Sequence, residues 1–276
     1  AFYRDVIFVS ILKLFSIRII YHLRGIGIKK SASRNKLNTI VYNFVFNKAI
    51  VVCLSKSHLK DIEGLPYAAH YVVHNGIKIE VNPDWPIVNN DVFKFLFLSN
   101  FVKSKGIFEV IEAVRILSAT RKDFRVLMVG AEVDVKNSEL IEHIRVLGLE
   151  NIIEISGPRY GEEKYLTLHH CDALVFPTYY PFEVFPGVIL EAMQCGKAVI
   201  STHHGVIEDI IDEGETGMLV QPKNVDQLAE RMNNFLSQKD QTKLMGQSGK
   251  EKFFREYTLK HFETNMKQMF EQVVTF

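Results

Sequence analysis

Short apolar runs alternate with helix-type patterns along most of the chain, and this alternation restricts the fold more than any other feature of the sequence. Most of the runs are about four to seven residues long and almost purely apolar, as expected for strands covered on both faces. We expect strands at 18–23, 49–54, 71–73, 93–99, 125–129, 152–156, 173–176, 198–202 and 218–220. We expect helices at 35–47, 56–63, 107–121, 138–147, 161–170, 187–194, 225–237 and, with a break near Tyr257, 241–274. The pattern predicts an α/β protein with parallel sheets and helices on both faces.

The apolar run 6–12 is too short to cross a bilayer, because charged residues precede and interrupt it. No small-residue cleavage site follows it, so it does not resemble a signal peptide either. We expect a buried helix over 3–15 that leads into a buried strand at 18–23. A chain that opens inside a core helix is expected to be an N-terminally incomplete piece of a larger protein.

A polar segment interrupts the alternation and marks the expected domain boundary. The turn signal 74–76 is followed by the proline-containing stretch 82–86 and by Asn89-Asn90-Asp91. We therefore predict a first domain over residues 1–88, a second domain over 89–253 and a C-terminal helix over 254–276. The second domain has room for a complete doubly wound sheet, whereas the first, with three strands, is short for its type.

Charge and motif content exclude several functional classes. The chain has 33 Lys and Arg against 32 Asp and Glu, which is too balanced for a protein whose main partner is nucleic acid. Its 3 cysteines are odd in number and widely spaced, which indicates a reducing compartment and no disulfide framework or zinc site. The His169-His170 and His203-His204 pairs would point apart on a helix or strand, so no metal site is predicted. Neither a serine-hydrolase nor a Walker motif occurs.

The predicted helix 187–194 begins where open α/β sheets bind their ligands. It follows a buried strand and a loop, so its N-terminus is expected at the carboxyl end of the sheet. The N–H groups of its first residues, Gly187, Val188 and Ile189, have no acceptor inside the helix and would suit a phosphate.

Two acidic residues accompany this helix. Glu191 lies about one turn inside it and could accept two hydrogen bonds from a vicinal diol such as ribose. Glu183 lies in the preceding loop and could reach a sugar beyond the phosphate. The alternative is that Glu183 is a solvated loop acid and Glu191 a helix surface residue. The apolar neighbours of Glu191 favour the functional interpretation, because a charge on a packed helix needs a partner.

A lysine-containing loop opens the first helix of the second domain. The segment 97–106 leaves a predicted strand and enters a helix at Gly106. Lys105 in such a loop could pair with a diphosphate, although a solvated loop lysine is the alternative. Its place in a strand–loop–helix unit favours the phosphate interpretation.

Together these segments resemble the retaining glycosyltransferases of family 4 (glycosyl transferases group 1), which have the two-domain GT-B fold. The likeness rests on a Lys-Gly loop, a Val-Gly strand end, two glutamates followed by Ala-Met, a Gly-Lys-Ala-Val-Ile strand, a Gly-x-x-Glu turn and a Gly-x-Leu-Val step. In this chain they are residues 99–106, 129–130, 183–193, 196–200, 205–208 and 217–220. The resemblance implies two Rossmann-like doubly wound domains, the first incomplete at its N-terminus, and a last helix that crosses back to the first domain.

The resemblance also implies a role for each site residue. Glu183 would bind the transferred sugar, Lys105 would stabilise charge on the leaving diphosphate, and His22 would be an active-site histidine of the first domain. These three are the expected catalytic residues. The expected nucleotide-sugar-binding residues are Ser99, Asn100, Arg159, Phe185, Pro186, Gly187, Val188 and Glu191. Among them, Glu191 would hold the ribose, and backbone groups near Arg159 would meet the base.

Two departures from the family pattern concern the phosphates. The family usually has an arginine where Asn100 stands, so one diphosphate contact is in question. A glycine-rich loop near the family's N-terminus, which approaches the phosphates and the acceptor, is absent from this sequence. No Asp-x-Asp occurs, and a metal-independent reaction without a cofactor is expected.

The sequence is therefore expected to specify a retaining hexosyltransferase that uses a nucleotide-diphosphate sugar and a glycan or lipid-linked acceptor. By analogy alone, its setting would be bacterial lipopolysaccharide or capsule synthesis in the cytoplasm, with peripheral contact to the inner face of the plasma membrane. Two alternatives remain open, a GT-B nucleotide-sugar epimerase and a non-catalytic nucleotide-sugar-binding module.

Overall fold

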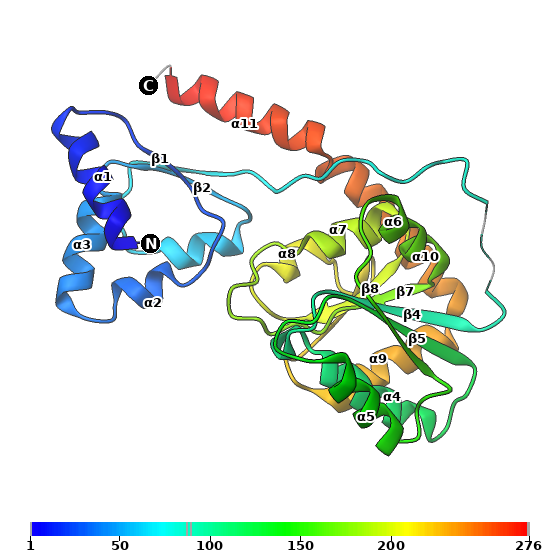
Figure 1. Ribbon diagram of the computed structural model, residues 1–276. Helices are drawn as coiled ribbons and strands as arrows, with labels where there is room; N and C mark the ends of the chain where they lie inside the picture. Colours follow the sequence, from blue (N-terminus) through cyan, green and yellow to red (C-terminus); the bar gives the residue numbers. More distant parts are fainter. Residues whose placement is uncertain (1, 87, 89, 275–276) are drawn as a thin grey trace. The chain divides into compact units, whose positions relative to one another are not determined.

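The computed structural model describes residues 2–86, 88 and 90–274, and contacts divide the chain into two compact units (Figure 1). The first unit runs to Asn75 and takes in the chain from Lys260 onward, and the second unit is Gly76–Leu259. Each unit has a parallel sheet with helices, so the predicted α/β class is confirmed. No helix in this described part of the chain is long and apolar enough to span a membrane.

The first unit has a three-stranded parallel sheet in the order β1-β2-β3. Its strands are β1 (Ile20–His22), β2 (Ile50–Cys53) and β3 (Ala69–Val72). The central strand β2 is buried on both faces because its side chains alternate, with Ile50 and Val52 in one cluster and Val51 and Cys53 in another. Its continuous apolar run is what made this strand predictable.

Helices cover both faces of this sheet. The cluster around Val51 and Cys53 takes in residues of α1 (Phe2–Leu14), α2 (Ile28–Ala32), α3 (Lys36–Phe46) and the 3-10 helix η1 (Ser57–Ile62). The cluster around Ile50 and Val52 is closed by Met269 and Val273 of α11 (Leu259–Val274). The last helix therefore contributes to the core of the first unit.

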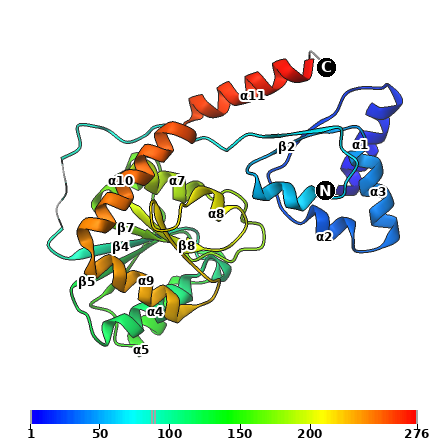
Figure 2. The same cartoon turned by 180° about the vertical axis from the view of Figure 1, so that it is seen from behind.

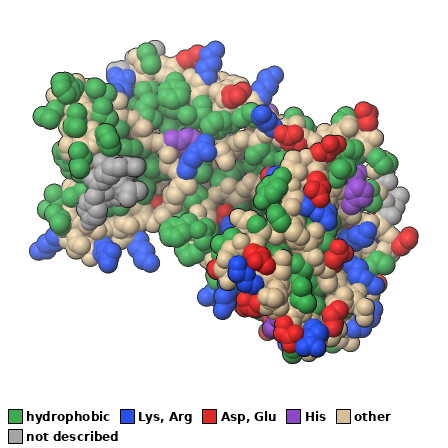
Figure 3. All heavy atoms as spheres, in the orientation of Figure 1, with side chains coloured by type: hydrophobic (Ala, Val, Ile, Leu, Met, Phe, Trp, Pro, Cys, Tyr) green, Lys and Arg blue, Asp and Glu red, His purple; other side chains and the backbone are tan. Residues whose placement is uncertain are grey.

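The structure corrects the expected burial of the first helix. α1 lies where it was predicted, but among its residues 6–14, whose side chains the structure describes, only Val9 is buried, while Ile7 is 63% and Phe8 60% exposed. The apolar residues of this helix are distributed around its whole circumference, and only one stripe of them can face the core. Apolar side chains consequently gather on the surface over α1 and α3 (Figure 3). The predicted helix 56–63 is likewise present only as the 3-10 helix η1.

The second unit has six parallel strands in the order β6-β5-β4-β7-β8-β9. They are β4 (Phe93–Leu98), β5 (Phe124–Val129), β6 (Ile153–Ser156), β7 (Ala173–Val175), β8 (Ala198–Thr202) and β9 (Gly217–Val220). Phe95, in the middle of β4, is fully buried and pairs with Val126 on one side and Ala173 on the other. The order of the strands reverses between β4 and β7, which makes that position the topological switch point.

Helices lie on both faces of this sheet, as Figures 1 and 2 show. They are α4 (Ile107–Ser118), α5 (Asn137–Val146), α6 (Gly161–His170), α7 (Gly187–Gln194), α8 (Ile207–Ile210), α9 (Val225–Ser237) and α10 (Lys239–Glu256), with the 3-10 helix η2 at Lys103–Lys105. α4 packs on α9, and α7 packs on α10. The break between α10 and α11 falls at Tyr257, as the sequence indicated.

The units divide at a different place from the predicted boundary at residue 88. The stretch that begins at Gly76 belongs to the second unit. The Ile77 N–H donates to the Tyr257 carbonyl at 3.0 Å, and the Glu80 N–H donates to the side-chain oxygen of Gln194 at 3.0 Å. Polar composition marks this stretch as a loop, but its hydrogen bonds decide which unit it joins.

Candidate functional site

Most of the predicted site residues lie around the switch point, at the carboxyl ends of β4 and β7. Lys105 ends η2, which follows β4, and Glu183 lies in the loop that leads from β7 to α7. In an open parallel sheet these two connections diverge and leave a crevice for ligands. The structure thus brings together one lysine and one glutamate that are 78 positions apart in the sequence.

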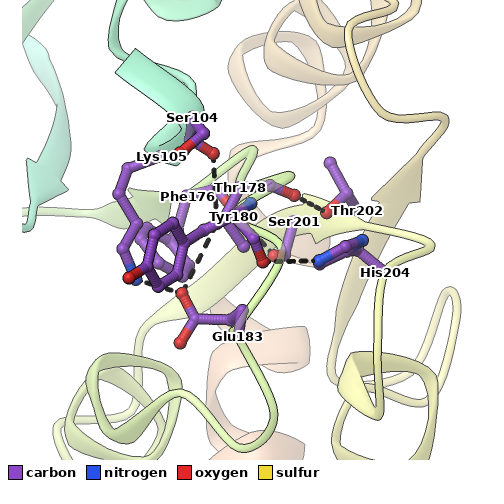
Figure 4. Close-up of polar contacts among 9 residues, drawn as sticks. All are labelled: Ser104, Lys105, Phe176, Thr178, Tyr180, Glu183, Ser201, Thr202 and His204. Atoms are coloured by element: carbon purple, nitrogen blue, oxygen red, sulfur yellow. Dashed lines mark hydrogen bonds and ion pairs between the residues drawn. The ribbon is translucent and has the colours of Figure 1, made fainter. Parts of the chain in front are cut away.

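Lys105 and Glu183 form an ion pair between the Lys105 Nζ and the Glu183 Oε2 (Figure 4). Their side chains are only 16% and 11% exposed, so neither is the solvated surface residue that the sequence left as an alternative. The ammonium also lies 4.7 Å from the ring centre of Tyr180 and 5.4 Å from that of Phe176. Two aromatic rings and a carboxylate therefore fix a cation at the end of the sheet.

Glu183 keeps one oxygen free of protein donors. Its Oε2 also accepts a long hydrogen bond of 3.4 Å from the Thr178 hydroxyl. No donor among the described residues reaches Oε1, and this atom is not among the buried unpartnered ones. Oε1 therefore remains available to a ligand hydroxyl.

Backbone contacts hold the loop that carries Glu183. Buried Ser201 donates to the Phe176 carbonyl at 2.7 Å, and buried Thr202 donates to the Thr178 carbonyl. The His204 Nε2 lies 2.8 Å from the Tyr180 carbonyl, and it carries the proton because a carbonyl can only accept. Strand β8 and the turn after it thus fix the shape of the loop (Figure 4).

Two glycines of the family-type motifs are explained by close approach. Gly106 has φ +86°, and a Cβ atom there would collide with the Pro177 backbone. Gly205 has φ +61°, and a Cβ atom there would lie 2.7 Å from the Glu183 carbonyl oxygen. Both glycines let a neighbouring segment pack directly against the loop of Glu183.

Glu191 lies in α7 between two fully buried apolar residues. Leu190 and Ala192 are 0% exposed, whereas the Glu191 side chain is 17% exposed. Its Oε1 accepts from the Lys164 Nζ at 2.6 Å. The residue therefore has the partner that a charge on a packed helix needs.

The start of α7 offers fewer amides than predicted. No acceptor in the described part of the chain is found for the N–H groups of Gly187 and Val188. The Ile189 N–H, however, donates to the Pro186 carbonyl at 3.2 Å, and Ile189 is fully buried. The prediction of a free Ile189 amide is wrong, because the first turn of the helix closes with this i to i+3 bond.

The remaining predicted residues have varied surroundings. Asn100 is exposed, and Pro186 is buried. The Ser99 N–H donates to Val129 O at 3.1 Å, which ties the loop to the end of β5. Arg159 donates to the Thr167 hydroxyl at 2.7 Å and to the Ser156 hydroxyl at 3.2 Å, and Phe185 packs edge-on against Tyr257.

His22 belongs to the first unit, whereas all the other predicted site residues belong to the second. It ends β1, and its ring stacks on Phe262 of α11 with the centroids 6.1 Å apart. Its Nε2 is buried and has no partner among the described residues. Burial, then the charges of Arg24 and His58, lower the pKa of His22 below 6.5, so the ring is neutral at neutral pH.

Lys164, Thr178 and Tyr180 contact the site but were not predicted. Thr178 and Tyr180 flank Glu183 in sequence, so the loop could have suggested them. Lys164 lies 27 residues from Glu191, and only the packing of α6 against α7 brings it there. Within the described ranges, no group of three or more His, Cys, Asp or Glu side chains could hold a metal ion.

Comparisons with known proteins show the family of the chain. The family model described as glycosyl transferases group 1 matches residues 82–252. An uncharacterized glycosyltransferase of Methanocaldococcus jannaschii, MJ1178, is 26% identical over 228 residues, which are 82% of this chain and 60% of that protein. The lipopolysaccharide 1,2-N-acetylglucosaminetransferase of Salmonella typhimurium is 25% identical over 76% of this chain and 59% of its own length. The chain thus spans about six tenths of the length of these relatives.

A similar fold occurs in solved structures. The crystal structure of Anabaena Alr3699/HepE in complex with UDP has a TM-score of 0.82 at 21% identity, covering 98% of this chain and 76% of that one. Sucrose-phosphate synthase from Thermosynechococcus elongatus has a TM-score of 0.75 at 20% identity, covering 94% and 68%. At this identity the likeness concerns the fold alone.

Proposed function

The chain belongs to the glycosyl transferases group 1 family and has the GT-B fold, and from this we propose that it transfers a hexose-type sugar from a nucleotide-diphosphate sugar with retention of configuration. The second unit would bind the donor. The acceptor would be a glycan or lipid-linked glycan in surface polysaccharide synthesis, at the cytoplasmic face of the plasma membrane. The Salmonella relative, a lipopolysaccharide transferase by name, supports this setting.

The observation that carries the proposal is the largely covered cation of Lys105 at the switch point. Lys105 and the free amides of Gly187 and Val188 lie at the carboxyl end of one sheet. A diphosphate held there would meet an ammonium and a helix N-terminus, both of which stabilise negative charge. Charge grows on the leaving diphosphate as the glycosidic bond breaks. Donors that are already fixed in place lower the energy of that state without reorganising.

The acids would bind the rest of the donor. The open Oε1 of Glu183 could accept a hydroxyl of the transferred sugar, and the open oxygen of Glu191 could accept a ribose hydroxyl. The segment around Arg159 would meet the base, with Ser99, Asn100, Phe185 and Pro186 lining the site. His22, neutral and with an unpartnered Nε2, is the proposed catalytic residue of the first unit.

Labelled donors test this function against its alternatives. The chain is incubated with UDP-, GDP- and ADP-hexoses that carry label in the sugar, with and without an extract of bacterial envelope glycolipids. We expect label in the glycolipid when the extract is present, and only slow hydrolysis of the donor without it. Conversion of the donor to another nucleotide sugar without an acceptor would instead identify an epimerase. Binding of a donor with neither transfer nor hydrolysis would identify a binding module.

A further inference from the structure

Lys164 is a charged residue in the second unit that neither the sequence analysis nor the proposed reaction uses. It lies in the first half of α6, and its Nζ is 2.6 Å from the Glu191 Oε1. The Lys164 side chain is only 24% exposed, and its ammonium also lies 4.9 Å from the ring centre of Tyr165. A pair this well covered loses more when one partner is removed than a surface ion pair does.

The position of Lys164 is fixed by packing between α6 and α7. Tyr165, the next residue, is 5% exposed and lies 3.4 Å from the side-chain nitrogen of Gln194, which is fully buried at the end of α7. The Gln194 side chain in turn accepts the Glu80 N–H. The packing of α6 against α7 therefore sets where the backbone of Lys164 lies relative to Glu191.

The two oxygens of Glu191 have different surroundings. Oε1 accepts from Lys164. No donor among the described residues reaches Oε2, and Oε2 is not among the buried unpartnered atoms, so it faces solvent. A carboxylate fixed through one oxygen presents the other in a single direction, as a hydrogen-bond acceptor for a ligand hydroxyl.

We propose that Lys164 is a positioning residue of the nucleotide site, which fixes Glu191 through Oε1 so that Oε2 meets the ribose hydroxyls and sets a preference for ribose over 2′-deoxyribose. The inference rests on nucleotide binding by the second unit. The ammonium has a second effect, because it balances the negative charge of Glu191 beside a ligand that itself carries a diphosphate.

The test compares ribose and deoxyribose ligands on three single variants and in a Glu191→Gln background. Affinities for UDP, GDP and ADP and for their 2′-deoxy counterparts are measured by calorimetry on the wild-type chain, and the tightest pair is then used. Lys164→Met removes the ammonium, Lys164→Arg keeps a cation, and Lys243→Met, an exposed lysine of α10, is the matched control. Circular dichroism and thermal unfolding verify that each variant is folded.

We expect the wild-type chain to prefer the ribose form by about tenfold, as one charged hydrogen bond allows. Lys164→Met should bind both forms less tightly and lose most of this preference. Lys164→Arg should restore the preference, and Lys243→Met should equal the wild type. In a Glu191→Gln background the preference should already be low, and adding Lys164→Met should not change it further.

Three results would overturn the inference. Lys164→Met with wild-type affinities for both forms would show that the pair only stabilises the fold. An equal loss for both ligands would show that the ammonium does not act through the ribose contact. Tighter binding by Lys164→Met would show that the pair blocks Glu191. A folded wild-type chain that binds no nucleotide would instead contradict the proposed function itself.

Discussion

At the scale of single residues, each acid of the site shares one carboxylate oxygen with a lysine and leaves the other open. Glu183 pairs with Lys105, and Glu191 pairs with Lys164. The four side chains are between 11% and 24% exposed, so a charge that loses its partner is only partly solvated. Substitutions here are expected to have larger effects than at exposed ion pairs such as Lys29 and Glu63.

The two acids should differ in what their truncation changes. Glu191→Ala is expected to weaken nucleotide-sugar binding, and Glu183→Ala is expected mainly to lower turnover, because in the proposed reaction Glu191 would contact the nucleotide and Glu183 the reacting sugar. Loss of either hydrogen-bonded contact should cost about 1–3 kcal/mol. Donor affinity and rate are measured for both variants, with the exposed Glu230→Ala as control. Equal losses of affinity with no loss of rate would contradict the assignment.

Transfer should survive a chelator. The charge on the leaving diphosphate would be met by Lys105 and by the amides of Gly187 and Val188, and the sequence has no Asp-x-Asp to hold a divalent ion. Turnover is measured with and without EDTA, at equal ionic strength. Loss of activity with EDTA that magnesium or manganese restores would show that the phosphate chemistry is different.

At the scale of elements, the site depends on close contacts between loops that follow different strands. The loop after β7 is held by side chains of β8 and by the turn at Gly205. Such contacts restrict the positions that the Glu183 loop can take, as a preorganised site would require.

Gly205→Ala should therefore damage the site more than the fold. The added Cβ would lie 2.7 Å from the Glu183 carbonyl oxygen, at φ +61°. Gly148→Ala is the matched control, because Gly148 has φ +67° and nothing within 4 Å. Both variants should lose about 1 kcal/mol of unfolding free energy from the backbone conformation. Only Gly205→Ala should also lower turnover; equal turnover in the two variants would show that the contact is unimportant.

The sequence predicts strands better than it predicts side-chain partners. The apolar runs of β2, β4 and β8 indicated buried strands, since a short apolar run in an α/β chain is typical of a strand covered on both faces. Short helices such as α2 and α8 have too few residues to show a period. The pairing of Lys164 with Glu191 is set by how two helices pack, and no local pattern records it.

The place of the segment 183–191 in the fold was predictable for a different reason. The acids at 183 and 191 have the spacing of the family motif that the sequence resembles. A helix that follows a buried strand also begins at one edge of the sheet, so the position of this segment could be inferred. The free Ile189 amide was predicted wrongly because the geometry of the first helical turn depends on its backbone angles. The site residues and their roles stay predictions until they are tested.

At the scale of the whole molecule, the chain ends contribute to one unit. Residues from Lys260 onward join the unit that the N-terminal part of the chain forms. Met269 and Val273 of α11 are 2% and 3% exposed and pack against Ile50, Val52 and Val73. The first unit therefore depends on a helix that follows the complete second unit in the sequence.

Truncating this contact should destabilise the first unit alone. Met269→Ala is expected to cost about 2–5 kcal/mol, as burial of this side chain is lost and a cavity remains. Phe270→Ala on the same helix is the control, because Phe270 is 46% exposed. Amide hydrogen exchange should show faster exchange in β1–β3 and unchanged exchange in β4–β9. Unchanged protection in β1–β3 would contradict the role of α11.

The central claim is that Lys105 in the second unit binds the diphosphate of a nucleotide sugar. Calorimetric titration of the wild-type chain and of Lys105→Met with UDP, GDP and ADP tests it most directly. We predict saturable binding of at least one nucleotide by the wild type. The variant should bind at least about tenfold more weakly, because it loses a charged contact and leaves Glu183 unpaired beside the phosphates. A folded wild-type chain that binds none of the three, or a Lys105→Met chain that binds equally well, would contradict the account.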